Sequence, residues 1–138
     1  MFKSNALLLT SFFIASFSSI AAQTAHERSL SVALTNSTAI VNASAPLLID
    51  EETRMDSAAT FKNFIIYNNS MVNYAAAELD VTLFDALIQE TVIDPLCANE
   101  NLTGFKDLGV VMVYRYLGKN GEFITEQSKD MKTCDEDI

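Results

Sequence analysis

The amino-acid sequence contains one histidine, no tryptophan, four glycines and two prolines among 138 residues. The histidine, His26, lies close to the N-terminus, where we expect the chain to fray. A Ser-His-Asp or Cys-His catalytic system would therefore lack a histidine held in place as the general base. The scattered glycines form no phosphate-binding loop. Too few histidine and cysteine ligands exist for a zinc site. We therefore expect no catalytic residue, no metal and no cofactor.

Basic residues are also scarce, with 9 Lys and Arg against 18 Asp and Glu, which gives a net charge of −9. This balance excludes a nucleic-acid-binding protein, because such a protein needs a basic face to replace phosphate counterions. A hydrophobic content of 49% and a charged content of 20% are ordinary for a globular chain. The length allows one modest domain.

The N-terminal residues differ from the rest. Lys3 precedes a short apolar run over residues 6–17, which ends in small residues, and this layout predicts a signal peptide over residues 1–21. The alternative, an uncleaved anchor, needs about 20 apolar residues, and this run is shorter. Removing 21 of 138 residues, with Lys3 the only charge among them, leaves 117 residues with a net charge of −10. We expect residues 22–138 to be a single α+β domain, periplasmic or secreted, with no membrane span.

The only two cysteines are Cys97 and Cys134. In an oxidising compartment an even pair of cysteines predicts a disulfide. The alternative, a catalytic cysteine, would need a base and a low pKa, and no base is available.

Two segments have helical spacing of their apolar residues. The first is Ala25–Ala45, although its many Ser, Thr and Asn residues give it a weak helix propensity. The second is Ala75–Cys97, and either Asp80 or Thr82 can cap the start of this helix. A linking turn should occupy residues 101–108.

Three segments are predicted to be strands. Leu47–Asp56 has no helical period and is predicted to be a loop leading into a short strand. Phe61–Val72 and Val110–Leu117 are apolar on both faces, and the second is expected to be central in the sheet. Lys119–Gly121 contains Asn-Gly, the strongest hairpin signal, so Glu122–Lys129 should be the partner strand. The predicted fold is α+β: two helices packed on a small antiparallel sheet, in the order helix, strand pair, helix, hairpin, with one disulfide.

From about Pro46 to Cys134, the chain resembles an uncharacterised family of small exported bacterial proteins. The resemblance is carried by an ordered set of motifs: Ile49–Ser57 with its Asp-x-x-Thr-Arg-x-Asp segment, Met71–Asn73, the helix ending in Cys97, Gly109-Val110, Tyr114–Tyr116, Asn120-Gly121 and Cys134. It implies a bacterial envelope or secreted protein with a disulfide, and it implies no activity.

Carboxylates cluster around Arg54, in a segment that contains Asp50, Glu51, Glu52 and Asp56. Two of them could do acid-base work or hold calcium, but EF-hand spacing is absent. We favour a solvated loop in which Arg54 pairs with a neighbour.

Tyr114 and Tyr116 share one face of the predicted central strand, and Tyr67 could join them. The three tyrosines are either part of the core, which we favour, or an aromatic recognition patch. With Arg54 and Asp56 they are the candidate binding residues. Arg115 lies on the other face and needs a carboxylate partner if it is buried, for which Asp56 or Asp85 is suggested.

Two function classes remain open. The first is an exported non-enzymatic binding or inhibitor-like module, whose acidic surface would favour a cationic protein, a peptide or a cell-wall component. The alternative is a structural accessory of a bacterial envelope assembly, docked through a sheet edge or the first helix. An enzyme that uses only carboxylates and tyrosines is the third and weakest hypothesis.

Overall fold

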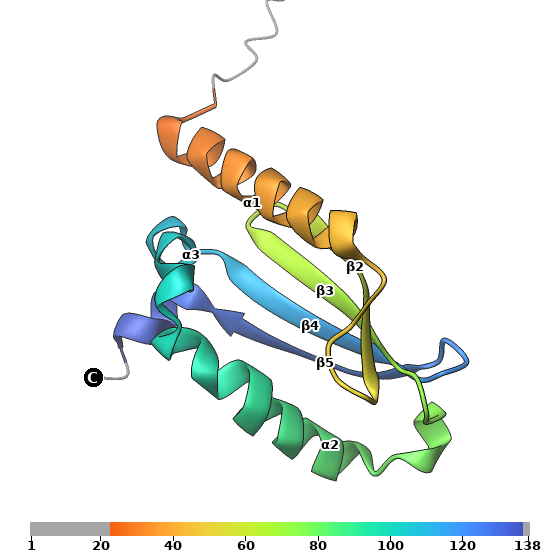
Figure 1. The fold of residues 1–138 in the computed structure, drawn as a ribbon. Helices are drawn as coiled ribbons and strands as arrows, with labels where there is room; N and C mark the ends of the chain where they lie inside the picture. The colour runs from red at the N-terminus through yellow and green to blue at the C-terminus, as the bar shows by residue number, and fades with distance from the viewer. Residues whose placement is uncertain (1–22, 137–138) are drawn as a thin grey trace, which may run out of the picture.

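The computed structural model describes residues 23–136, and the predicted signal peptide lies outside them. The α+β class is confirmed (Figure 1). The helices are α1 (Ala25–Ser44), α2 (Val81–Ile88) and α3 (Thr103–Leu108). The strands are β1 (Leu47–Leu48), β2 (Thr53–Phe61), β3 (Phe64–Met71), β4 (Val111–Leu117) and β5 (Phe123–Asp130). Short helical segments are η1 (Ala76–Glu78), η2 (Gln89–Ile93), η3 (Asp94–Ala98), η4 (Glu100–Leu102) and η5 (Met131–Asp135).

The five strands form one sheet in the order β1-β2-β3-β4-β5. The pairs β1–β2, β2–β3 and β4–β5 are antiparallel, but β3 and β4 are parallel. The expectation of a purely antiparallel sheet is therefore wrong. The reason is the crossover between β3 and β4, which contains α2 and α3. It returns the chain to the end of the sheet where β3 begins, so β4 runs in the same direction as β3. The strand expected to be central, β4, is an interior strand between β3 and β5, whereas the middle of the five strands is β3.

Local sequence signals account for most element boundaries. Thr24 caps α1 by accepting a hydrogen bond from the Glu27 N–H, and the Glu27 side chain accepts one from the Thr24 N–H. His26 consequently lies exposed in a capped first turn and not in a frayed terminus. Asp80 caps α2, and Gly109 ends α3 with a left-handed φ of 67°.

The structure corrects three further expectations. The segment over residues 101–108 is helical in η4 and α3, and not a linking turn. The helix expected over Ala75–Cys97 is divided into η1, α2, a π-helical turn and η3. Strand β2 is nine residues long and begins at Thr53, so Arg54 and Asp56 belong to a strand and not to the preceding loop. β2 contains a bulge at Asp56, where the register with β3 shifts.

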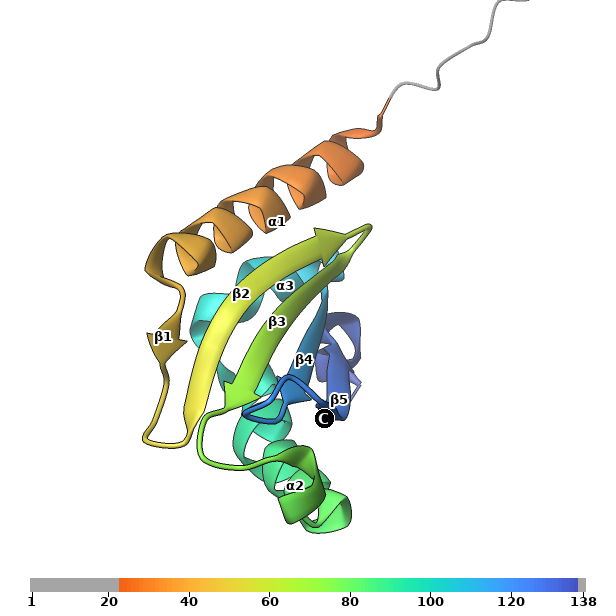
Figure 2. The same cartoon turned by 90° about the vertical axis from the view of Figure 1, so that its right-hand side faces the viewer.

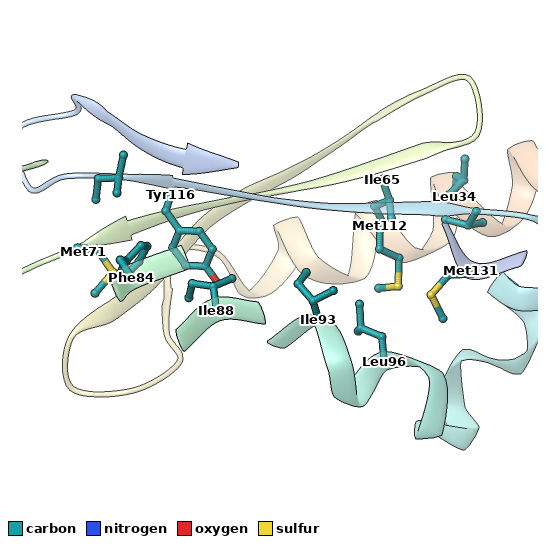
Figure 3. Packing of buried hydrophobic residues seen from close by; sticks show 12 residues of the cluster. Leu34, Ile65, Met71, Phe84, Ile88, Ile93, Leu96, Met112, Tyr116 and Met131 are labelled. Atoms are coloured by element: carbon teal, nitrogen blue, oxygen red, sulfur yellow. The ribbon is translucent and has the colours of Figure 1, made fainter. Parts of the chain in front are cut away.

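The hydrophobic core lies between one face of the sheet and the helices. In Figure 2, α3 lies behind β2 and β3, α2 lies below the sheet, and α1 runs beside β2. Figure 3 shows Leu34 of α1 near Ile65 and Met112 of the sheet, with Ile93 and Leu96 packed from below. Ile65 is fully buried, and Leu34 and Met112 are each 2% exposed.

The predicted disulfide is confirmed. Cys97 in η3 and Cys134 in η5 are bonded, with their Cα atoms 5.2 Å apart. The bond ties the end of the α2 segment to the segment that follows β5, 37 residues later. Within residues 23–136, none of the helices has the length and apolar character that a bilayer span requires.

Candidate functional site: a groove between α1 and α2

A groove of about 720 Å³ opens between α1 and α2, with the sheet as its floor. We call it the α1–α2 groove. Its walls are Val41 of α1 and residues of the α2 segment, among them Phe84, Leu87, Thr91 and Val92. Its floor is built from β2, β3 and β4, and contains Met55, Tyr67, Asn69, Met71, Met112, Tyr114 and Tyr116. Its volume lies within the range of known ligand sites, and its lining is mainly apolar.

Strand alternation explains why the tyrosines face the groove. Met112, Tyr114 and Tyr116 are two residues apart on β4, so their side chains point to one face and span roughly 13 Å along the strand. Tyr67 is the register partner of Tyr114 on β3 and therefore shares that face. Figure 3 shows Tyr116 beside Phe84 and Ile88, and Met112 nearer to Leu96.

The aromatic rings pack against one another. The rings of Tyr67 and Tyr114 stack with their centroids 5.1 Å apart, and Tyr116 meets Phe84 edge to face at 5.3 Å. Tyr116 is buried, whereas Tyr67 and Tyr114 are half-buried. The tyrosines thus pack in or against the core and also line the floor of the groove. Their role as a recognition patch stays a prediction.

The hydroxyl groups of these tyrosines have no hydrogen-bond partner among residues 23–136. Burial raises the pKa of Tyr67, and burial followed by the neighbouring tyrosines raises that of Tyr114. Burial and then the Asp50 carboxylate raise the pKa of Tyr116 to about 12. All three hydroxyls are therefore protonated at neutral pH and can donate to a bound group.

Among residues 23–136, Asp50 and Glu52, in the loop between β1 and β2, are the only charged residues that line the groove. Asp50 accepts hydrogen bonds from the N–H groups of Glu52 (2.8 Å) and Thr53 (2.7 Å). The bond from Glu52 is the main cause that lowers the pKa of Asp50, although burial opposes it. Glu52 accepts a hydrogen bond of 2.7 Å from the Tyr74 hydroxyl. Two oriented carboxylates therefore stand at one end of an otherwise uncharged groove.

The structure separates the other candidate residues from the tyrosines. Arg54 and Asp56 form an ion pair (2.5 Å), and Asp56 also accepts a hydrogen bond from Ser70. Ser70 follows Asn69, which faces the groove, so strand alternation places this cluster on the opposite face of the sheet.

Neither Asp56 nor Asp85 is the partner of Arg115, so both suggestions are wrong. Arg115 pairs with its register neighbour Glu126 at 2.7 Å on the open face of the sheet. Asp85 instead accepts a hydrogen bond from Thr125 and so attaches α2 to β5.

Sequence reasoning missed the link between the tyrosines and Asp50, because the two lie on different strands and loops. One pattern in the sequence could have indicated this link. Thr53 and Met55 alternate along β2 and share a face with Tyr116, which places the end of the β1–β2 loop near that face. In the part of the chain that the structure describes, no group of three His, Cys, Asp or Glu residues could hold a metal ion.

No family model matches the sequence, and no curated protein matches it. Solved structures do match its fold. A secreted-protein candidate from Pseudomonas aeruginosa has a TM-score of 0.67 and 17% identity, over 82% of this chain and 99% of that one. EpsS, a pilotin of the type 2 secretion system of Vibrio vulnificus, has a TM-score of 0.62 and 15% identity, over 79% and 94%. AspS, the type II secretion system pilotin of Vibrio cholerae, has a TM-score of 0.61 and 15% identity, over 79% and 95%. At these identities the likeness establishes a common fold that spans nearly the whole of each neighbour.

Proposed function

We propose that this chain is an exported, non-enzymatic accessory of a bacterial envelope assembly, and that it docks a segment of another envelope protein in the α1–α2 groove. The observation that carries the proposal is the α1–α2 groove itself, which is mainly apolar and has on its floor three tyrosine hydroxyls without a hydrogen-bond partner in the described part of the chain. Two fold neighbours are pilotins of secretion systems, which supports an accessory role over a free-standing binding module.

The residue chemistry also favours binding over catalysis. A hydrolytic site would need a base or nucleophile with a pKa moved toward neutrality, whereas the groove tyrosines have raised pKa values and Asp50 a lowered one. The disulfide supports an oxidising compartment.

Site-specific photo-crosslinking in the native host tests the proposal. Leu87 and Leu83 are both exposed leucines one turn apart on α2, but only Leu87 lines the groove. A benzophenone amino acid at position 87 should crosslink to one exported subunit of an envelope assembly, identified by peptide mass spectrometry, and the same group at position 83 should not. Equal crosslinking from both positions, or none from position 87 in correctly folded protein, would refute docking in the groove.

The crosslinked subunit must also depend on this chain. Deleting the gene, or replacing Leu87 with glutamine, should reduce assembly or stability of that subunit, while Leu83→Gln should not. Crosslinking without any such dependence would mean that the groove binds a client and has no accessory role.

A further inference from the structure

The occupant of the α1–α2 groove can be described more closely from the charges and shape of its lining, on the basis of the proposed function. We infer that the occupant is an amphipathic helical segment that carries lysine or arginine at the end lying against Asp50 and Glu52.

The backbone of the floor favours a helix over an added strand. The floor is the face of β2, β3 and β4, and the backbone groups of these strands are already paired with one another. An extended peptide gains most of its affinity from backbone hydrogen bonds at a free sheet edge, and a sheet face offers none. A helix satisfies its own backbone groups and needs only an apolar surface.

The length of the floor fits two to three helical turns. The roughly 13 Å between the side chains of Met112 and Tyr116 corresponds to about nine residues of α-helix, at 1.5 Å per residue. Such a segment presents three apolar side chains on one face, at positions i, i+3 or i+4, and i+7. These side chains would rest on the tyrosine rings, and Leu87 and Val41 would flank them.

The charge of the groove is one-sided. At the end near Tyr116 stand Asp50 and Glu52, and each is oriented by a hydrogen bond. The end near Met112 is bordered by Leu96, and the described lining residues other than Asp50 and Glu52 carry no charge. A cation on the occupant is therefore favoured at one end only, and the tyrosine rings add a favourable surface for it. A fatty acid or other anionic amphiphile would place its charge against the two carboxylates or leave it in the apolar end, which disfavours it.

The chain as a whole reinforces this preference. Its net charge of −9 attracts cationic segments over a distance and raises their rate of encounter, an effect that salt screens. The net charge of the chain does not determine the orientation of the bound segment in the groove, whereas the positions of Asp50 and Glu52 do. The experiment must therefore separate the local effect from the general one.

Fluorescence anisotropy with three labelled 14-residue helical peptides tests the inference. All three peptides have leucine at positions i, i+3 and i+7 on an alanine and glutamine background. They differ in the two residues at one end, which are two lysines, two glutamines or two glutamates. Each peptide is prepared in two forms, with these two residues at the N-terminus or at the C-terminus. The lysine peptide should bind at least about tenfold more tightly than the glutamate peptide in 50 mM salt, and the glutamine peptide should lie between them. The difference should shrink severalfold in 500 mM salt.

Matched variants identify the carboxylates responsible. Asp50→Asn combined with Glu52→Gln should bring the lysine and glutamine peptides to within about twofold of each other, because asparagine still accepts the loop hydrogen bonds that Asp50 accepts. Glu51→Gln removes a neighbouring exposed charge that does not line the groove, and it should leave the preference intact.

The possible failures can be told apart. Equal binding of the three peptides, weakened by Leu87→Gln, would overturn the inferred charge preference and leave docking in the groove standing. The same charge preference in the Asp50/Glu52 double variant as in Glu51→Gln would attribute it to net charge, and would also overturn the inference. Absence of binding by every peptide would contradict both the inference and the proposed function.

Discussion

The attachment of α1 to the sheet includes a pair of hydrogen bonds made by a single side chain, so one substitution can test it. α1 has 20 residues, but Leu34 is its only buried residue. Eight positions later, Asn42 holds the edge of β2: its Nδ2 donates to the Ala58 carbonyl (2.9 Å), and its Oδ1 accepts from the Ala58 N–H (2.8 Å). β1 is only two residues long and pairs with β2 as far as Met55, so Asn42 takes the place of a missing strand neighbour at Ala58.

Replacing Asn42 with alanine removes both hydrogen bonds. Each contributes about 0.5–1.5 kcal/mol net, and Ala58 is 5% exposed, so its freed backbone groups are poorly hydrated. Alanine has a higher helix propensity than asparagine, which stabilises the variant by about 0.6 kcal/mol and partly offsets this loss. The two hydrogen bonds less the gain in helix propensity give a loss of about 0.4–2.4 kcal/mol. The poor hydration of the freed Ala58 groups places the expected fall in the free energy of unfolding in the upper half of that range, about 1.4–2.4 kcal/mol, which corresponds to a decrease in Tm of roughly 6–10 °C for a domain of this size.

Urea unfolding followed by circular dichroism measures this change, and amide hydrogen exchange at Ala58 reports on the hydrogen bonds directly. Asn36→Ala is the matched control, because Asn36 is exposed in the same helix and has no side-chain hydrogen bond to the described residues. The control should be neutral or slightly stabilising. Asn42→Asp should be intermediate, since it keeps the acceptor for the Ala58 N–H and loses the donor. If Asn42→Ala and Asn36→Ala agree within about 0.5 kcal/mol, the reasoning is wrong.

Three further predictions concern other parts of the domain. Absorbance titration of the tyrosines should show Tyr116 ionising near pH 12, and Asp50→Asn should lower that pKa. Because the pKa of Tyr116 is higher in the folded than in the unfolded state, its contribution to stability should be intact below pH 10 and should be lost as the pH rises toward 12. Gly109→Ala should cost about 1–2 kcal/mol in thermal unfolding, because residue 109 has a φ of 67°, whereas Gly104→Ala, in open space within α3, should stabilise by up to about 1 kcal/mol. Replacing both cysteines with serine should destabilise by about 4 kcal/mol in the chain-entropy treatment, and an unchanged urea midpoint would contradict it.

Features that depend on neighbours in sequence were accessible without the structure. The spacing of apolar residues predicts α1 over Ala25–Ala45, and the structure has it over Ala25–Ser44. The Asn-Gly turn predicts the hairpin of β4 and β5, and the cysteine pair predicts the disulfide. These signals are readable because the hydrogen bonds or steric preferences behind them join residues a few positions apart, or because only one pairing is possible. The signal peptide and the resemblance to a family of exported proteins remain predictions.

The tertiary structure alone decided which of these elements meet. Whether β4 joins β3 in a parallel or an antiparallel pair depends on the path of the 39 residues between Met71 and Val111, and no local pattern encodes that path. The same holds for the α1–α2 groove, where Asp50 comes to face Tyr116, 66 residues later in the chain. Alternation along a strand tells which side chains share a face, so the three tyrosines could be grouped from the sequence. Which helices border that face, and which charge stands at its end, is set by packing between distant segments, and this is where the candidate site arises.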